Sequence, residues 1–404
     1  MSFNNLTVFK NKRVLLLQGP VGPFFKRFAD DIGRLNAQII KINFNAGDTF
    51  FYPSGICFDR PMGEWPAYVA NLIQTHRIEL IALFGDCRSI HIEAKEVARE
   101  LGVEVYVFEE GYLRPNHITL EHQGVNGYSR LAGLASAHLL QTHQNIQPPP
   151  VVEVGKTYWH AVWWAILYYL MAALGQYRFP HYQHHRPLTV REAWPWIRST
   201  WRKQFFKYKE RDVFKKLTGD LSQHYFLVPL QVHNDFQISH HSPYHCIEDF
   251  IKQVIVSFAQ HAPEECCLVL KQHPFDRGYK DYRRLIEHIV KEQNVQHRVL
   301  YIHDQYLPDL LTHARGVVVI NSTVGLSAVE ELRPVKVCGE AVYNLPQLTA
   351  QMPLDEFWRA ASDIQPNSAH VNQYLNYLCR HTQHNGSFYR KIKGYRHSTG
   401  VLWS

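Results

Sequence analysis

Short apolar segments alternate with amphipathic segments along most of this chain, and the alternation occurs twice. The first series predicts strands at 13–19, 38–44, 79–85 and 103–111, with helices at 23–35 and 90–102. The second series predicts strands at 225–231, 265–273, 297–303, 316–322 and 334–340. Strands that are apolar throughout and separated by helices indicate parallel sheets covered on both faces. The fold class is therefore α/β, with two Rossmann-like lobes.

The chain has 404 residues, which is too long for one compact core and favours two lobes. The proline run in QNIQPPPVVEVGK (144–156) predicts a linker between them. The predicted parts are an N-terminal Rossmann-like lobe at 1–143, a linker and helical insert at 144–222, a C-terminal Rossmann-like lobe at 223–360 and C-terminal helices at 361–404 that cross back to the first lobe.

Composition excludes several classes of protein. The seven cysteines include no CxxC pair, which argues against a disulfide framework and a zinc ribbon. The first residues, MSFNNLTVFKNKRVLLLQG, lack the long apolar segment and small-residue cleavage site of a secretory signal. We therefore expect a protein of the cytoplasm or of the membrane face that borders it.

The insert combines an apolar run with a basic one. YWHAVWWAILYYLMAALG (158–175) is close to the roughly 20 residues that span a bilayer, but its Trp and Tyr content favours a helix at the membrane interface. Eleven Lys or Arg and three acids lie between 178 and 216, while the whole chain has a formal net charge of +7. An apolar helix beside a polybasic segment predicts peripheral attachment to anionic lipid. A helical hairpin buried in the second lobe is the alternative.

Sites in such sheets lie beyond the carboxyl ends of the strands, and in a two-lobed protein they face the cleft. Three carboxylates follow strands there: Glu109 and Glu110 on the first lobe, and Asp235 on the second. One acid on each lobe would suit glycosyl chemistry, in which one group moves a proton and the other stabilises or captures the sugar. No DxD pair follows a strand, so we expect no metal site for a sugar nucleotide. A helix-capping or salt-bridging pair at the surface is the alternative for the two glutamates, and an ordinary polar turn is the alternative for Gln231 and Asp235.

Other strand ends carry residues suited to anions. GPVG (19–22) opens a helix, so its glycines would let an anion approach free N–H groups, although a tight turn explains them equally well. Ser322 or Thr323 occupies a helix N-cap after Asn321, which predicts a phosphate site or a plain cap. Lys271 and His273 could contact a phosphate or sugar oxygen, and Arg88 and Arg114 could hold a substrate carboxylate. The histidine-rich stretches SHHSPYH and QHH (183–185) lack zinc-ligand spacing, so a zinc site is not favoured.

Seven long stretches, in order and mostly at predicted strand ends, resemble those of the capsule polysaccharide Kdo transferases of the KpsS/LipB type, relatives of the KpsC modules. The stretches are LLLQGPVGPFFKRFADDI (15–32), INFNAGDTFF (42–51), FGDCRSIH (84–91), VFEEGYLRPNHITLEHQGVNGYS (107–129), PLQVHNDFQISHHSPY (229–244), LKQHPFDRGYKDY (270–282) and INSTVGLSAV (320–329).

This resemblance implies a GT-B glycosyltransferase, whose two Rossmann-like lobes face a central cleft. It implies transfer of β-Kdo from CMP-Kdo, with retention and without a metal or other cofactor, to phosphatidylglycerol or its lyso form. The transfer would start the poly-Kdo linker of a bacterial capsular polysaccharide. It places the enzyme on the cytoplasmic face of the inner membrane, with the next Kdo transferase and the capsule export machinery as candidate partners.

The resemblance also implies roles for single residues. The family's QxxxD motif falls on Gln231 and Asp235, which makes Asp235 the expected nucleophile and Glu109 or Glu110 the expected acid/base. Its HP motif falls on His273 and Pro274. The expected donor-binding residues, on the lobe at 223–360, are Gln231, Lys271, His273, Pro274, Asn321, Ser322 and Thr323. The expected substrate- or acceptor-binding residues, on the lobe at 1–143, are Gly19, Gly22, Asn45, Asp48, Arg88, Tyr112, Arg114 and Asn126.

Two other classes of function compete with an enzyme. A cytoplasmic scaffold that couples capsule synthesis to export would not need opposed carboxylates in a polar cleft. A nucleic-acid-binding protein could stack bases on the aromatic residues of the insert, but the strongly apolar run beside the basic segment fits lipid better.

Overall fold

The computed structural model describes residues 5–132, 150–182 and 193–403, which form two compact units. Of the described residues, unit 1 comprises 5–130, 150–182 and 376–403, and unit 2 comprises 131–132 and 193–375. Of the expected insert, the described residues 150–182 belong to unit 1 and those from 193 onward belong to unit 2. The QHH stretch and the start of the expected linker lie outside the described residues.

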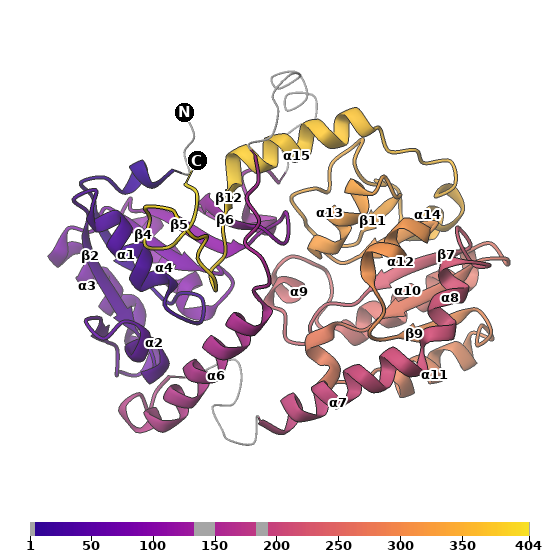
Figure 1. Cartoon of the computed structure of the whole chain (residues 1–404), viewed down its shortest axis with the longest axis horizontal. Coiled ribbons are helices and arrows are strands. Elements are labelled where there is room, and N and C mark those ends of the chain that lie inside the picture. The colour runs from indigo at the N-terminus through magenta and orange to yellow at the C-terminus, as the bar shows by residue number, and fades with distance from the viewer. Residues whose placement is uncertain (1–4, 133–149, 183–192, 404) are drawn as a thin grey trace. The chain divides into compact units, whose positions relative to one another are not determined.

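Unit 1 is built on a seven-stranded sheet in the order β12-β6-β5-β4-β1-β2-β3 (Figure 1). Its parallel strands are β1 (Arg13–Leu16), β2 (Gln38–Asn43), β3 (Ile56–Cys57), β4 (Leu80–Phe84) and β5 (Glu104–Glu110). The four predicted strands of this lobe are confirmed. β6 (His117–His122) and β12 (Gln383–Asn385) are antiparallel and were not expected. β6 follows β5 too closely for a crossover connection, so the two strands pair as a hairpin.

Helices cover both faces of this sheet because its strands are apolar on both sides. α1 (Phe24–Gly33) packs on the face that carries Val14, Leu16 and Phe108. α3 (Trp65–His76) and α4 (Ser89–Glu100) pack on the opposite face. Other helical segments described in unit 1 are α2 (Ala46–Phe51), α6 (Tyr158–Leu174) and the 3-10 turns at Leu6–Phe9, Met62–Glu64, Asn126–Tyr128 and Gln176–Arg178.

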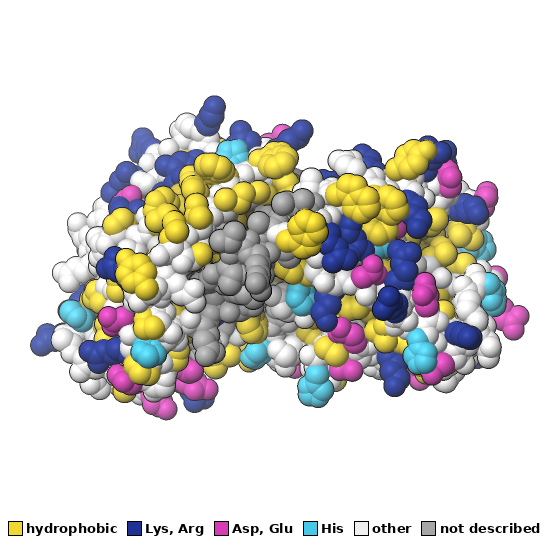
Figure 2. Space-filling view, turned by 90° about the horizontal axis from the view of Figure 1, so that it is seen from below, with side chains coloured by type: hydrophobic (Ala, Val, Ile, Leu, Met, Phe, Trp, Pro, Cys, Tyr) yellow, Lys and Arg dark blue, Asp and Glu magenta, His cyan; other side chains and the backbone are white. Residues whose placement is uncertain are grey.

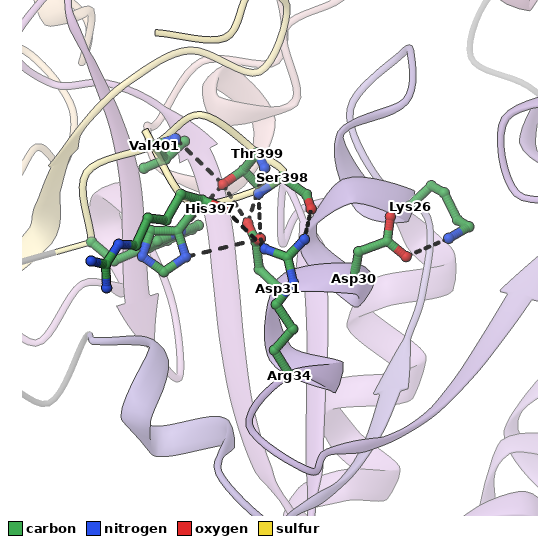
Figure 3. A network of polar contacts seen from close by, with 10 residues as sticks. Lys26, Asp30, Asp31, Arg34, His397, Ser398, Thr399 and Val401 are labelled. Atoms are coloured by element: carbon green, nitrogen blue, oxygen red, sulfur yellow. Dashed lines mark hydrogen bonds and ion pairs between the residues drawn. The ribbon is translucent and has the colours of Figure 1, made fainter. Parts of the chain in front are cut away.

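The C-terminal segment completes unit 1. Phe388 enters the core and meets the Phe24 ring edge-on, with the ring centroids 4.7 Å apart. Farther along, the fully buried carboxylate of Asp31 in α1 accepts hydrogen bonds from Thr399 N at 2.9 Å, from Thr399 Oγ1 at 2.7 Å and from Ser398 N (Figure 3). Arg34 adds bonds to Ser398 Oγ and to the Arg396 carbonyl. One buried side chain thus fixes the chain end on α1.

Unit 2 contains a five-stranded, entirely parallel sheet in the order β11-β10-β7-β8-β9. The strands are β7 (Tyr225–Pro229), β8 (Cys267–Lys271), β9 (Val299–Ile302), β10 (Gly316–Val319) and β11 (Val335–Val337). All five were predicted and are confirmed. Its core gathers Phe226 and Phe258 around Trp358, whose indole N–H donates to Ser257 at 2.8 Å.

Helices surround the sheet of unit 2 as the alternating pattern predicts. They are α7 (Ala193–Lys209), α8 (Arg211–Thr218), α9 (Phe236–His240), α10 (Ile247–His261), α11 (Arg283–Glu292), α12 (Leu307–His313), α13 (Thr323–Glu330) and α14 (Leu354–Ala360), with a 3-10 turn at Pro274–Gly278. α15 (Ser368–Thr382) begins in unit 2 and ends in unit 1, so the division between the units falls within this helix. Each unit is therefore an α/β layer structure of its own.

Candidate active site

Gln231 and Asp235 follow β7, at the carboxyl end of the central strand of unit 2. Asp235 is the N-cap of α9 and accepts a hydrogen bond from Gln237 N at 3.0 Å. The amide nitrogen of Gln231 donates both to Asp235 Oδ2 at 3.1 Å and to Asn321 Oδ1 at 2.9 Å. Gln231 is buried whereas Asp235 is only partly buried. A buried amide therefore holds a reachable carboxylate in place.

Asn321 belongs to the same cluster although it follows a different strand, β10. Its amide nitrogen donates to the carbonyls of Gln237 and His241, which tie α9 to the end of β10. Ser322 is the N-cap of α13, where its hydroxyl accepts from Val324 N at 3.2 Å. Thr323 is the first residue of that helix. The structure thus brings the expected residues of β7 and β10 together, and it gives Ser322 a capping role that needs no ligand.

Lys271 and His273 follow β8, beside β7. The Lys271 ammonium is buried and donates to the His303 carbonyl at 3.0 Å. Burial lowers the pKa of Lys271 to about 8, and the carboxylate of Asp304 opposes this shift. His273 caps the following turn by accepting from Phe275 N at 3.1 Å, and Pro274 is exposed. A buried ammonium with a lowered pKa is thus a feature of this strand end.

Ionic residues that the sequence did not single out surround Lys271. Glu210 pairs with His303 at 2.5 Å, and Arg277 pairs with Asp304 at 2.7 Å. These four side chains are largely buried, and Glu210 comes from the junction of α7 and α8. Burial raises the pKa of Asp304, whereas Arg277 and Lys271 act in the opposite direction. Arg277 lies in one of the stretches quoted for the family resemblance, but nothing local in the sequence pairs it with Asp304.

Glu109 and Glu110 end β5 in unit 1, and their environments differ. The Glu110 carboxylate accepts a hydrogen bond from the Tyr389 hydroxyl at 2.7 Å. Glu109 accepts from the Glu110 N–H at 2.9 Å. Burial raises the pKa of Glu109 to about 7, with contributions from the charges of Glu110 and Asp86, while the Glu110 N–H and Arg88 oppose the shift. The Glu109 carboxyl would thus exchange a proton near neutral pH.

The loop after β4, which contains Gly85, lies beside Glu109. A methyl group built at Gly85 would lie 3.6 Å from Glu109 Oε2 and 3.8 Å from Arg88 Nε. Gly85 has a φ of +70°, which favours glycine. Arg88 itself donates to Gln18 Oε1 at 2.8 Å. Glu109 and Arg88 therefore both lie beside the Gly85 loop, where an added methyl group would contact them.

A buried polar network links Arg88 to α6. Asp48 accepts from Gln18 at 3.2 Å, from Phe44 N at 3.0 Å and from the Tyr168 hydroxyl at 3.1 Å. Asn45 caps α2 and donates to the same hydroxyl at 2.6 Å. The Tyr182 hydroxyl accepts from the Gln18 amide at 2.9 Å. Asn45, Asp48 and Arg88 thus belong to one network, in which their partners are other groups of the protein, and substrate binding by them stays a prediction.

The other expected residues of unit 1 have structural partners as well. A side chain at Gly19 would meet the Phe25 ring at 2.7 Å, and one at Gly22 would meet Trp164 at 3.1 Å. The Tyr112 hydroxyl donates to Glu121 at 2.7 Å and accepts from Asn126 N at 2.6 Å. Arg114 donates to the Gly111 carbonyl at 3.0 Å. Packing accounts for both glycines, and substrate binding by these residues remains a prediction.

No group of three or more His, Cys, Asp or Glu side chains in the described part of the chain is arranged to hold a metal ion. Of SHHSPYH, His241 is buried and contacts Glu340 at 3.2 Å, whereas His240 is exposed on α9. Transfer without a metal remains a prediction. Among the described helices, none is both long and apolar enough to cross a membrane.

Comparison with known proteins identifies the family. The model of the family described as capsule polysaccharide biosynthesis protein matches residues 79–389. The chain is 40% identical over 403 residues to the capsule polysaccharide export protein KpsS of Escherichia coli, covering 96% of this chain and all of that protein. It is 37% identical to the capsule polysaccharide modification protein LipB of Neisseria meningitidis serogroup B, covering 94% of this chain and 92% of that protein. This chain belongs to the capsule polysaccharide biosynthesis family.

The region matched to the capsule polysaccharide biosynthesis family includes the ends of β4, β5, β7, β8 and β10, and hence Glu109 and Asp235. Gln18 and Asp48 precede it, but the alignments to KpsS and LipB extend over nearly the whole chain. The expected membership in this family is therefore confirmed. Its members' individual reactions are not settled by the match.

Solved structures give weaker likenesses to this member of the capsule polysaccharide biosynthesis family. The β-Kdo 2,7 transferase KpsC of Thermosulfurimonas dismutans has a TM-score of 0.40 and 17% identity, with 84% of this chain and 88% of that chain covered. The UDP-GlcNAc 2-epimerase of Methanocaldococcus jannaschii has a TM-score of 0.30 and 13% identity, with 91% and 99% covered. At these TM-scores neither likeness bears on the activity of this chain.

Proposed function

We propose that this protein is a glycosyltransferase that transfers β-Kdo from CMP-Kdo to phosphatidylglycerol or lysophosphatidylglycerol and so starts the poly-Kdo linker of a capsular polysaccharide. The observation that carries the proposal is the Gln231 amide, which joins Asp235 to Asn321 at the ends of two neighbouring parallel strands. A carboxylate held in a fixed position can act as a nucleophile toward a sugar. The chain belongs to a family of capsule polysaccharide biosynthesis, in which such a reaction is needed.

In the proposed reaction Asp235 attacks the anomeric carbon of Kdo. The bond from that carbon to the phosphate oxygen breaks, and CMP leaves with the electron pair of the bond. The acceptor hydroxyl then attacks the same carbon, the bond to Asp235 breaks, and the carboxylate is regenerated. Two displacements at one carbon retain its configuration. No metal is required by this scheme, because buried cations of the protein can receive the phosphate charge.

Glu109 is the proposed base that removes the proton from the acceptor hydroxyl. Its raised pKa of about 7 suits a group that takes and gives a proton at neutral pH. Glu110 is the weaker candidate because its carboxylate accepts the hydrogen bond from the Tyr389 hydroxyl. The structure thus supports a choice between the two adjacent glutamates that the sequence left open.

Lys271 is proposed to supply positive charge for the donor phosphate, with His273, Asn321, Ser322 and Thr323 as further donor-binding residues. The acceptor is proposed to lie on unit 1, where Arg88 and the Gly85 loop border Glu109. The proposed location is the inner face of the cytoplasmic membrane. CMP-Kdo and an anionic lipid are the substrates, and the next Kdo transferase and the export machinery are proposed partners.

The test is incubation of the purified protein with CMP-Kdo and a short-chain phosphatidylglycerol, followed by mass spectrometry of the lipid fraction. The expected product is the lipid carrying one added Kdo, formed equally well with and without a metal chelator. Absence of the product from active wild-type preparations would leave a scaffold as the better function. An inverted anomer in the product would remove Asp235 from its role as nucleophile.

A further inference from the structure

α7 turns polar side chains toward its own unit and aromatic side chains toward the outside, which is the reverse of an ordinary surface helix. Its inner side carries polar groups: Arg202 pairs with Asp281 at 2.7 Å, and Arg277 donates to Ser199 at 3.3 Å. Glu210, directly after the helix, pairs with His303 at 2.5 Å. The outer side carries Trp194, Trp201, Phe205 and Tyr208, which are between 42% and 69% exposed. Helices of water-soluble units normally turn their aromatic residues inward.

These contacts hold the aromatic face outward. Phe206 is buried on the inner side of α7 and stacks on His303 with the ring centroids 3.6 Å apart. Because Arg202 and Glu210 both bond to side chains of unit 2 and are buried, rotating the helix would leave buried charges without partners. The exposure of the aromatic residues is therefore a fixed property of unit 2.

Cations lie among the exposed rings. Lys209 lies over the Phe205 ring at 5.6 Å, and Arg211 lies over the Tyr208 ring at 4.6 Å. Arg198 is exposed four residues after Trp194 and three before Trp201, a spacing that places it on the same side of the helix. Figure 2 looks at the protein from the side on which α7 is drawn in Figure 1, and shows dark-blue side chains beside yellow ones. Positive charge and aromatic surface are thus mixed on one face.

α6 offers a second, more apolar face on unit 1. Trp159, Trp163, Ile166, Leu170 and Leu174 follow one another at intervals of three or four residues and are between 46% and 73% exposed. Such spacing places them along one side of the helix. The opposite side is fixed by the Tyr168 hydroxyl, which bonds to Asp48 and Asn45.

We propose that the outer face of α7, defined by Trp194, Arg198, Trp201, Phe205, Tyr208 and Lys209, docks on an anionic lipid bilayer, and that the exposed side of α6 on unit 1 is a second lipid-contacting face. Trp and Tyr prefer the headgroup zone, and Lys and Arg are attracted by anionic headgroups. Two copies of the α7 face would instead bring like charges together, which disfavours self-association. The inference deepens the proposed function and rests on it, because the bilayer would supply the acceptor lipid.

The experiment is sedimentation of the full-length protein with vesicles of phosphatidylcholine alone or mixed with phosphatidylglycerol, without CMP-Kdo. One variant, the α7 variant, replaces Arg198, Lys209 and Arg211 by Ala; Arg211 is the first residue of α8 and lies over the Tyr208 ring. A second replaces Trp159, Trp163 and Leu170 by Ser. A matched control replaces Lys252, Arg284 and Lys291, which are exposed on α10 and α11, by Ala. Circular dichroism establishes that all three variants fold.

The wild type should bind the anionic vesicles at least tenfold more tightly than the neutral ones. The α7 variant should lose roughly 10- to 100-fold in affinity for the anionic vesicles only, since each cation contributes about a fivefold factor near such a surface. The α6 variant should weaken binding to both kinds of vesicle, and the α10–α11 control should bind as the wild type does. Equal binding of the wild type to both vesicles, or an unchanged lipid preference in the α7 variant, would overturn the proposal. So would a dimer that forms without lipid and is lost in either helix variant.

Transfer to a soluble short-chain acceptor separates this inference from the proposed function. Under both proposals the α7 variant retains that transfer, and Asp235→Asn binds vesicles like the wild type but transfers nothing. Vesicle binding without any transfer by the wild type would contradict the proposed function alone. Transfer without vesicle binding would contradict the docking surface alone.

Discussion

The side-chain amide of Gln231 donates a hydrogen bond to the Asp235 carboxylate at 3.1 Å while the same nitrogen also bonds to Asn321. Asp235 therefore depends on a residue of its own loop and, through it, on the next strand of the sheet. This relationship makes Gln231 a positioning residue for the carboxylate.

Replacement of Gln231 by Ala should lower kcat by about 100-fold, because a small displacement of a reacting group is enough to cause a loss of this size. The KM for the acceptor should change little. Steady-state kinetics of CMP release measure both constants. Gln253→Ala, an exposed change on α10, is the control and should match the wild type. An equal loss in the control, or none in Gln231→Ala, would contradict the positioning role.

The pH dependence of kcat/KM should reveal Glu109. Its pKa is raised to about 7, so the carboxyl is protonated below that pH and cannot act as a base there. Activity should consequently rise with pH up to about 7. Glu109→Gln should abolish this rise of kcat/KM with pH together with most of the activity, whereas Glu110→Gln should keep the rise. If the rise of kcat/KM with pH disappeared only in Glu110→Gln, Glu110 would be the base.

A second pH effect is expected from Lys271. Burial lowers its pKa to about 8, so the ammonium loses its charge as the pH rises through 8. If that charge attracts the donor phosphate, the KM for CMP-Kdo should increase above pH 8 while the KM for the acceptor stays constant. Lys271→Met should show a high donor KM at every pH. A donor KM that is flat from pH 7 to 9 in the wild type would exclude this role.

Asp31 and Asp30 provide a matched test of the C-terminal attachment. Asp31→Ala removes a buried acceptor of three hydrogen bonds from Ser398 and Thr399 and should lower the free energy of unfolding by about 3 kcal/mol. Asp30 is exposed and pairs only with Lys26 among the contacts drawn in Figure 3, so Asp30→Ala should change stability by roughly 0.5 kcal/mol or less. Urea denaturation measures both values. Similar losses in the two variants would contradict the attachment.

The parts of this protein that follow from local sequence were predictable. Apolar strands between amphipathic helices gave the parallel sheets, and the polar residues after each strand located Gln231, Asp235 and Glu109. The antiparallel strand β12 and the core position of Phe388 were not predictable, because both depend on contacts between the chain end and residues more than 250 positions earlier.

The different hydrogen bonding of Glu109 and Glu110 also depends on a residue far along the chain, and the local sequence did not predict it. The two residues are adjacent and chemically identical, and Tyr389 distinguishes them from a position far along the chain. The pairs Glu210–His303 and Arg277–Asp304 also join segments whose local sequence gives no sign of a partner. In each case a distant segment supplies the contact that sets the chemistry of a strand end.

The most direct test of the central claim is acceptor-dependent release of CMP from CMP-Kdo by Asp235→Asn, compared with the wild type and with Asp309→Asn, an exposed change on α12. The account predicts a fall of at least about 1,000-fold in Asp235→Asn with an unchanged fold, since removal of a nucleophile costs this much or more. Asp309→Asn should be fully active. Wild-type release of CMP by Asp235→Asn would contradict the account.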